Sequence, residues 1–209
     1  MPSIMRFAGS KSFLYLLFLV PACAHYEARP TPEPAREAMM AQTVEGIRLS
    51  ASRPEESYGA FDADLQGNGI FPLLLYYQND SGLSVQAARR DIVLSSRGGG
   101  CRQLAVGDVS ERIGFSPAGR YFAWSYGLLG IGIIPGTIDH FKAEEANRAI
   151  SQDLVAKELR DVTLAPSEKA QGFVFFECPN NSRPTELREA LSAADGRLLR
   201  FTIEFPDSR

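Results

Sequence analysis

The chain has 209 residues, of which 44% are hydrophobic and 22% are charged, and its formal net charge at pH 7 is −3. This is the composition of an ordinary globular protein with one medium-sized domain, and it argues against a disordered chain. A domain of this size buries about 70% of the surface that its unfolded chain would expose, so its stability requires neither a metal nor many disulfides.

The N-terminus has the pattern of an export signal. Residues 1–12 contain Arg6 and Lys11 and no acidic residue, and the apolar run FLYLLFLV follows at residues 13–20. As a helix this run spans only about 12 Å, whereas a membrane crossing needs about 20 apolar residues. The pattern therefore predicts a signal peptide, residues 1–22, that is removed from the mature chain.

A cysteine follows the apolar run at the expected cleavage site. The motif VPAC at residues 20–23 resembles the lipobox of bacterial lipoproteins, in which the cysteine becomes the acylated N-terminus. Pro21 stands where that family usually has a small or polar residue. The resemblance implies two or three acyl chains, palmitate among them, on Cys23. Such attachment is persistent, whereas a single chain holds a protein only reversibly.

Residue 24 bears on both the cleavage site and the cellular location of the protein. Ala22 and Ala24 form an A-x-A site, so an ordinary exported product that begins at His25 is the alternative. For a lipoprotein of a bacterium with two membranes, Ala24 implies an outer-membrane protein that faces the periplasm. In a bacterium with one membrane, the expected location is the outer face of the plasma membrane.

The net charge of the mature chain indicates which classes of partner it can bind. Without Arg6 and Lys11 the chain has 20 basic and 25 acidic residues, which is a net charge of −5. An acidic protein argues against nucleic acid as a partner and against electrostatic binding to anionic lipid. We therefore expect membrane contact through the N-terminal lipid, and an envelope protein as the type of macromolecular partner.

Two cysteines remain in the mature chain besides the anchor. The space outside the inner membrane is oxidising, which favours a disulfide between Cys101 and Cys178. Such a bridge would close a loop of 77 residues and contribute on the order of 4 kcal/mol. Two thiols are the alternative, because the spacing alone does not establish proximity.

The mature chain divides into a tether and one domain. Prolines at positions 30, 32 and 34 lie within residues 23–42, and this spacing favours an extended lipid-anchored spacer. Residues 35–42 are good helix formers that would add a turn or two of helix. The single domain follows over residues 43–209.

The first half of the domain has the pattern of short strands. TVEGIRLSA at residues 43–51 alternates like one strand, with Ile47, Leu49 and Ala51 on its inner face. Turn residues at 79–82 separate two apolar segments, 69–78 and 83–88, which together predict a hairpin. RDIVLSS at residues 90–96 predicts another strand, ended by the glycines of RGGG.

The middle of the chain predicts one long helix after an unusual apolar stretch. Residues 108–113 predict a helical turn capped by Asp108. Residues 121–136, YFAWSYGLLGIGIIPG, are apolar with four glycines, and they fit either a buried crossover, which we favour, or a segment that inserts into a bilayer surface or a partner. A helix over residues 138–160, capped by Thr137, then carries an apolar stripe.

Strand patterns return near the C-terminus. VTLAPSEKAQGFVFFECP contains a turn at Pro166 and Ser167, and its FVFF run at residues 173–176 predicts a strand covered on both faces. Residues 186–193 and 196–205 flank the turn signal at Asp195 and predict a hairpin, with a short helix over the first segment as the alternative.

Several short strands with a helical insertion predict a mainly β fold, an immunoglobulin-like β-sandwich. VTLAPSEKAQGFVFF, at residues 162–176, resembles the late strands of immunoglobulin-like domains in bacterial envelope lipoproteins. The resemblance covers fifteen residues and implies the fold alone. It assigns no role to Trp124 and no disulfide.

No pattern in the sequence predicts catalysis or metal binding. The two histidines are His25 in the tether and His140 in the first turn of the predicted helix. Neither has a local signature that would activate Cys101 or Cys178 as a nucleophile. The chain has no C-x-x-C and no H-x-x-H motif. We therefore expect a binding or structural module with no cofactor, no identified small-molecule substrate and no enzymatic activity.

Overall fold

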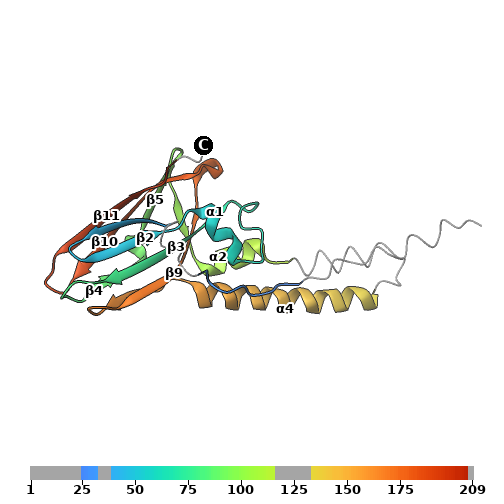
Figure 1. Cartoon of the computed structure of the whole chain (residues 1–209). Coiled ribbons are helices and arrows are strands. Elements are labelled where there is room, and N and C mark those ends of the chain that lie inside the picture. Colours follow the sequence, from blue (N-terminus) through green and yellow to red (C-terminus); the bar gives the residue numbers. More distant parts are fainter. Residues whose placement is uncertain (1–24, 33–38, 116–132, 207–209) are drawn as a thin grey trace, which may run out of the picture.

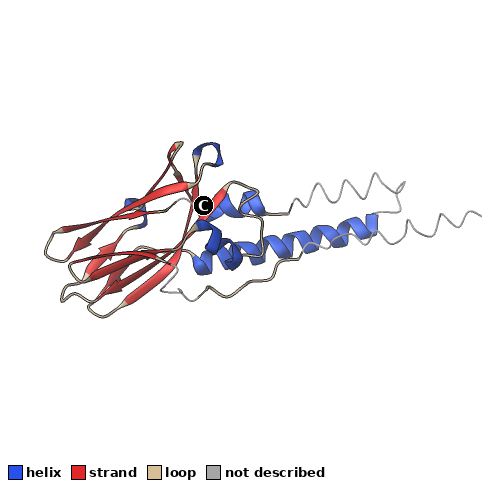
Figure 2. Cartoon of the chain, turned by 45° about the horizontal axis from the view of Figure 1, so that its top comes forward, coloured by secondary structure: helices blue, strands red, loops and turns tan. Residues whose placement is uncertain are grey.

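The structure is a computed structural model that describes residues 25–32, 39–115 and 133–206, with the backbone alone for residues 133–140. Two antiparallel sheets face each other and helices cover one of them (Figures 1 and 2). The prediction of a mainly β sandwich with a helical insertion is confirmed. Two short helices accompany the long one; the first, over residues 54–57, was not predicted, and the second includes the predicted helical turn at residues 108–113.

The first sheet has the strand order β1-β2-β3-β9-β7, and the second has the order β6-β5-β10-β4-β8, with β11 paired to β10. The strands are β1 (Met40–Val44), β2 (Ile47–Ala51), β3 (Ile70–Asn79), β4 (Val85–Ala87), β5 (Val93–Ser96), β6 (Gly99–Gly100), β7 (Arg102–Leu104), β8 (Val162–Leu164), β9 (Lys169–Glu177), β10 (Pro184–Ala193) and β11 (Leu198–Glu204). The α-helices are α1 (Pro54–Ser57), α2 (Val106–Ile113) and α4 (Ile133–Lys157), and the 3-10 turns are η3 (Tyr58–Ala60), η4 (Arg89–Asp91) and η5 (Pro179–Asn181).

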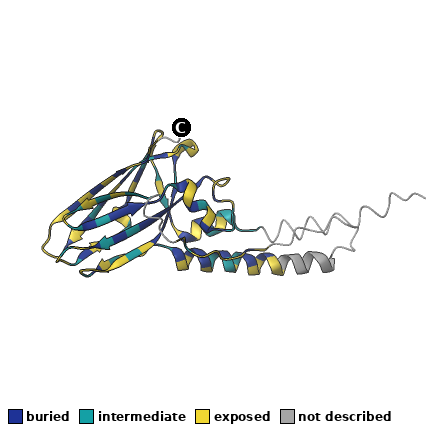
Figure 3. Cartoon of the chain, in the orientation of Figure 1, coloured by how far each residue is buried: buried dark blue, intermediate teal, exposed yellow. Residues whose placement is uncertain are grey.

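The first sheet is the middle layer, and both of its faces are buried. In β9, Val174 and Phe176 pack against the second sheet, whereas Phe173 and Phe175 pack against the helices. Both faces of this strand were predicted to be covered, and the structure confirms it. Figure 3 shows the buried positions where the sheets and helices meet. The molecule therefore has two cores, one between the sheets and one beneath the helical layer.

Helix α4 differs from its predicted bounds at both ends. It begins at Ile133, five residues before the predicted start, so Thr137 is not its cap. Pro135 fits there because the first turn of a helix needs no N–H from that position. The helix ends at Lys157 because the Leu159 N–H donates to the Phe173 carbonyl over 2.8 Å.

Gly172 permits this close approach of the chain after α4 to β9. A Cβ at Gly172 would lie 2.5 Å from the Leu159 Cα atom, which leaves no room for a side chain. A glycine in a strand interior commonly marks such an approach of another backbone.

The segment predicted as one strand at residues 43–51 is a hairpin. β1 and β2 pair from Met40 with Ala51 to Val44 with Ile47. Glu45 and Gly46 form the turn with φ of 48° and 83°, as a two-residue type I′ turn requires. The first strand therefore begins at Met40, and the helix expected over residues 35–42 is wrong for its last four residues, 39–42.

The predicted hairpin across residues 79–82 is also wrong. β3 lies in the first sheet, whereas β4 pairs with β8 and β10 in the second, so the chain changes sheets here. Asn79 is fully buried, and its amide nitrogen donates to the carbonyls of Leu83 and Leu164 over 2.8 and 3.0 Å. These bonds replace the pairing that a hairpin would have supplied.

Two other predicted elements are close to those in the structure. α2 begins after Ala105, so Asp108 lies in its first turn and is not its cap. The C-terminal hairpin is confirmed, with β10 paired to β11 from Glu186 with Glu204 to Ser192 with Leu198. The short helix that was the alternative for residues 186–193 is therefore wrong.

Candidate functional site

The predicted lipid anchor, Cys23, lies outside the described residues, but the segment that follows it is docked on the domain. His25 is exposed, whereas Tyr26 is only 8% exposed. The Tyr26 hydroxyl donates to Asp153 Oδ2 of α4 over 2.6 Å. Burial, followed by the bond to Asp153, raises the pKa of Tyr26 above its ordinary value. The segment predicted as a spacer is thus held at its start.

Tyr26 joins a buried ion pair in the helical layer. Lys157 Nζ lies 2.7 Å from Asp153 Oδ2, one helical turn away, and both side chains are less than a tenth exposed. The same ammonium donates to the Ala60 carbonyl over 2.8 Å and lies 4.9 Å from the centre of the Phe61 ring. A buried pair is tolerated when further hydrogen bonds satisfy both charges, as they do here.

A second contact follows Tyr26 at the surface. Arg29 Nη2 lies 2.6 Å from Asp62 Oδ1, and the Glu27 N–H donates to Asp62 Oδ2 over 3.3 Å. Exposed ion pairs contribute little free energy. This pair instead fixes the direction in which the segment leaves Tyr26. We call the contacts of Tyr26 and Arg29 with Asp153 and Asp62 the N-terminal clasp.

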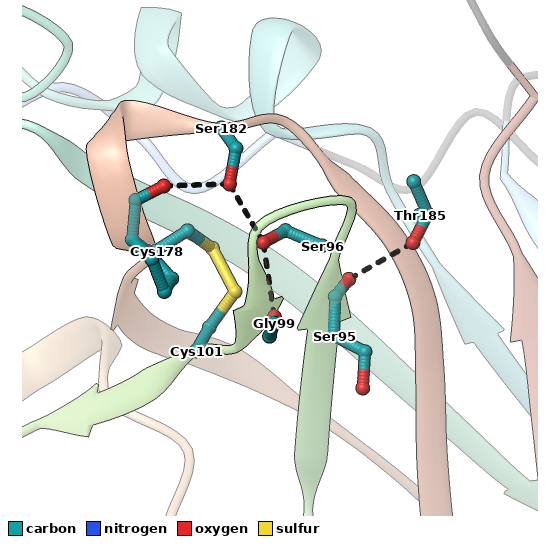
Figure 4. The surroundings of a disulfide bond; sticks show 8 residues. Ser95, Ser96, Gly99, Cys101, Cys178, Ser182 and Thr185 are labelled. Carbon is teal, nitrogen blue, oxygen red and sulfur yellow. Dashed lines mark hydrogen bonds between the residues drawn. A yellow bond between two sulfur atoms is a disulfide. The ribbon is translucent and has the colours of Figure 1, made fainter.

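The two other cysteines form a disulfide with an S–S distance of 2.03 Å (Figure 4). The strand register explains the pairing, because β7 and β9 pair Arg102 with Glu177, and the cysteines are the next residues on each strand. Cys101 lies where the chain passes from β6 in the second sheet to β7 in the first. The disulfide therefore joins the ends of the neighbouring strands β7 and β9 of the first sheet, where the chain passes between the sheets.

Hydroxyl groups hold the glycine loop beside the disulfide. Ser96 Oγ lies 2.7 Å from Ser182 Oγ and donates to the Gly99 carbonyl over 3.0 Å, and Ser182 donates to the Pro179 carbonyl over 2.7 Å (Figure 4). A Cβ at Gly98 would lie 2.8 Å from Ser182 Oγ. The glycine loop that ends the predicted strand at residues 90–96 is thus packed against η5.

Arginines surround the carboxylate next to the disulfide. Arg112 Nη1 lies 2.8 Å from Glu177 Oε1, and Arg102 Nη2 lies 2.6 Å from Glu177 Oε2. The hydrogen bonds from Arg112 and then Arg102 lower the pKa of Glu177 to about 2. The carboxylate therefore links α2, β7 and β9 at the surface.

A buried carboxylate, that of Glu189, lies between the two sheets. The Tyr77 hydroxyl donates to Glu189, 2.8 Å from Oε1 and 3.0 Å from Oε2, and the two side chains are 0% and 3% exposed. Burial raises the pKa of Glu189 to about 7, although the bond from Tyr77 lowers it. Asp91 raises the same pKa further. No residue pattern in the sequence distinguished this glutamate from an exposed one.

The disulfide bears on whether Cys101 or Cys178 could act as a catalytic nucleophile. A sulfur atom held in a disulfide is not a thiolate nucleophile, so Cys101 and Cys178 have a structural use here. The side chains of His140 and Trp124 lie outside the described part of the chain, as does most of the stretch 121–136. Among the described residues, no group of three His, Cys, Asp or Glu side chains could hold a metal ion.

An open groove lies at the end of β11. Its volume is about 540 Å³, and it is lined by Arg97, Thr185, Glu186, Glu204, Phe205 and Pro206. Acidic and basic side chains face it together, so its charge does not select one class of ligand. No helix within the described residues is long and apolar enough to cross a membrane.

Comparisons with known proteins give no relative for this chain. No family model matches it, no curated protein matches it, and no solved structure matches it.

Proposed function

We propose that this chain is a lipid-anchored cell-envelope protein whose extracytoplasmic domain is a binding or structural module without catalysis. The observation that carries the proposal is the position of Cys23, directly after the apolar run of an export signal. By resemblance to bacterial lipoproteins, Ala24 favours the outer membrane and the periplasm in a bacterium with two membranes.

The disulfide supports the same compartment. Bonds of this kind form and persist in secreted and periplasmic proteins and are rare in the cytosol. Cys101 and Cys178 are the two cysteines that the mature chain keeps besides Cys23, and both are used in the bond. Their sulfur atoms join the ends of β7 and β9, which agrees with a structural use of these residues.

Labelling with radioactive palmitate in growing cells tests the anchor. We expect label on the full chain, loss of the label in Cys23→Ala, and retention in the matched control Ala24→Ser, which keeps the acylated residue. A Cys101→Ser, Cys178→Ser variant should also keep the label. An unlabelled full chain, or label that persists in Cys23→Ala, would overturn the proposal.

A second candidate function is a membrane-active or oligomerising protein that uses residues 121–136. The observation that favours it is the course of α4, whose N-terminal end at Ile133 lies away from the sandwich (Figure 1). The glycines and aliphatic residues of the stretch would allow close packing against a bilayer or a partner. Liposome flotation of a soluble Cys23→Ala form tests binding to a bilayer, and a protein that stays at the bottom of the gradient removes the membrane-active version of this function.

A further inference from the structure

The N-terminal clasp fixes the start of the mature chain on the helical layer. Tyr26 is buried against α4, and its hydroxyl bonds to Asp153, which is itself paired with a buried lysine. Arg29 then pairs with Asp62 just after η3. A segment that served only as a spacer would need neither a buried tyrosine nor a defined acceptor for it.

The clasp lies very close to the proposed anchor in the sequence. Cys23 precedes Tyr26 by three residues, so their Cα atoms are at most about 11 Å apart even in a fully extended chain. Resting on the proposed acylation of Cys23, we infer that the clasp holds the domain directly against a lipid bilayer, with the helical layer on the membrane side.

The shape of the molecule defines which part faces away from the bilayer. α4 and the hairpin of β10 and β11 extend in opposite directions from the middle of the molecule (Figure 1). The sheet that contains this hairpin is separated from the helices by the whole first sheet. Facing sheets lie about 10 Å apart. The turn between β10 and β11 is therefore the membrane-distal end of the domain.

Fluorescence quenching in vesicles tests this orientation. The acylated full-length protein, with one reporter cysteine labelled by a fluorophore, is reconstituted in vesicles of phosphatidylethanolamine and phosphatidylglycerol that carry a nitroxide on some headgroups. Gln152→Cys places the reporter on the exposed side of α4 beside the clasp, and Ala194→Cys places it at the β10–β11 turn. The disulfide leaves no other thiol in the mature chain.

We expect stronger quenching at position 152 than at position 194. Tyr26→Ala with Arg29→Ala should abolish this difference, because the domain then moves on a longer chain. Glu27→Ala is the matched control and should preserve the difference, since only the backbone N–H of Glu27 contacts Asp62. Should the double variant fail to fold, Tyr26→Phe with Asp62→Asn removes the hydroxyl contact with Asp153 and the ion pair with Arg29 at nearly constant size.

The outcomes separate the clasp from the anchor. Equal quenching at both positions in palmitate-bearing protein overturns the orientation and leaves the anchor intact, and so does a difference that survives the double variant. Absence of palmitate on Cys23 overturns the anchor and the orientation together. Hydrogen exchange in the soluble Cys23→Ala form then measures the contact of the Glu27 amide with Asp62 independently of the anchor. A protected Glu27 amide supports the clasp, and an unprotected one contradicts it.

Discussion

Two buried clusters in this protein place a tyrosine hydroxyl on a carboxylate, and they differ in one respect. In the helical layer, Tyr26 donates to Asp153, whose charge is balanced by the ammonium of Lys157. Between the sheets, Tyr77 donates to Glu189, and within the described residues it is the one donor to that carboxylate. Within the described residues no cation pairs with Glu189, and burial raises its pKa to about 7.

The comparison shows how one motif can have two effects. With a cation, the carboxylate joins elements that are distant in the sequence, since residues 26 and 153 are 127 positions apart. Without a cation, the same pair of groups makes the stability of the sandwich depend on pH around neutrality. The largest changes are expected where a buried charge loses its partner.

Removing the cation should have the largest effect. Lys157→Met leaves Asp153 buried without its counterion, and we expect a loss of about 3–5 kcal/mol in the free energy of unfolding. Urea unfolding at pH 7 measures it. Arg148→Met, which changes an exposed basic residue of the same helix, should stay within about 0.5 kcal/mol of the wild type. Equal losses in the two variants would contradict the account of the pair.

Removing the uncompensated charge should stabilise the protein above neutral pH. The pKa of Glu189 rises from 4.5 to about 7 on folding. The folded state therefore binds more protons than the unfolded state between these pH values, and stability falls as the pH rises through this window. The loss is on the order of 3 kcal/mol and persists above pH 7.

Glu189→Gln keeps an acceptor for Tyr77 and cannot ionise. We expect the variant to exceed the wild type in stability at pH 8 by much more than at pH 5, measured by urea unfolding at both values. Parallel profiles of stability against pH for the two proteins would show that Glu189 does not titrate in this window.

Removing the first tyrosine hydroxyl should have a smaller effect. Tyr26→Phe deletes the hydrogen bond to Asp153 while Lys157 stays in place, and we expect a loss of about 2 kcal/mol. Tyr58→Phe is the control, because no hydrogen bond of its hydroxyl is seen among the described residues. If the two variants melt at the same temperature, Tyr26 does not contribute as the structure indicates.

The smallest effect is expected for the exposed ion pair beside the disulfide. Glu177 has a pKa lowered to about 2 by Arg112 and Arg102, so its contribution is present above pH 4.5 and is lost as the pH falls toward 2. Because the side chain is 35% exposed, Glu177→Gln should cost less than about 1 kcal/mol at pH 7. A loss as large as that of Lys157→Met would place this pair among the buried ones.

The sequence predicts the strands whose burial pattern is simple. Phe201 and Ile203 alternate with polar residues in β11, and the FVFF run of β9 reports two covered faces; the structure confirms both. The turn at Glu45 and Gly46 was missed because the residues on both sides of it alternate like one continuous strand. Its E-G pair is a two-residue turn signal that could have revealed the hairpin.

The contacts between distant segments could not be predicted in the same way. The change of sheet after Asn79 depends on an amide that bonds to Leu164, 85 positions away. Tyr26 looks like part of a proline-rich spacer, and only the folded helix α4 supplies its acceptor. Local periodicity reports which face of an element is buried, but it contains no information about the residue that covers that face.

The most direct test of the proposed lipid anchor is the mass of the N-terminal peptide of the mature protein. We predict a peptide that begins at Cys23 and carries the mass of acyl chains on that residue. A peptide that begins at His25, without added mass, would contradict the anchor and with it the placement of the helical layer at the bilayer.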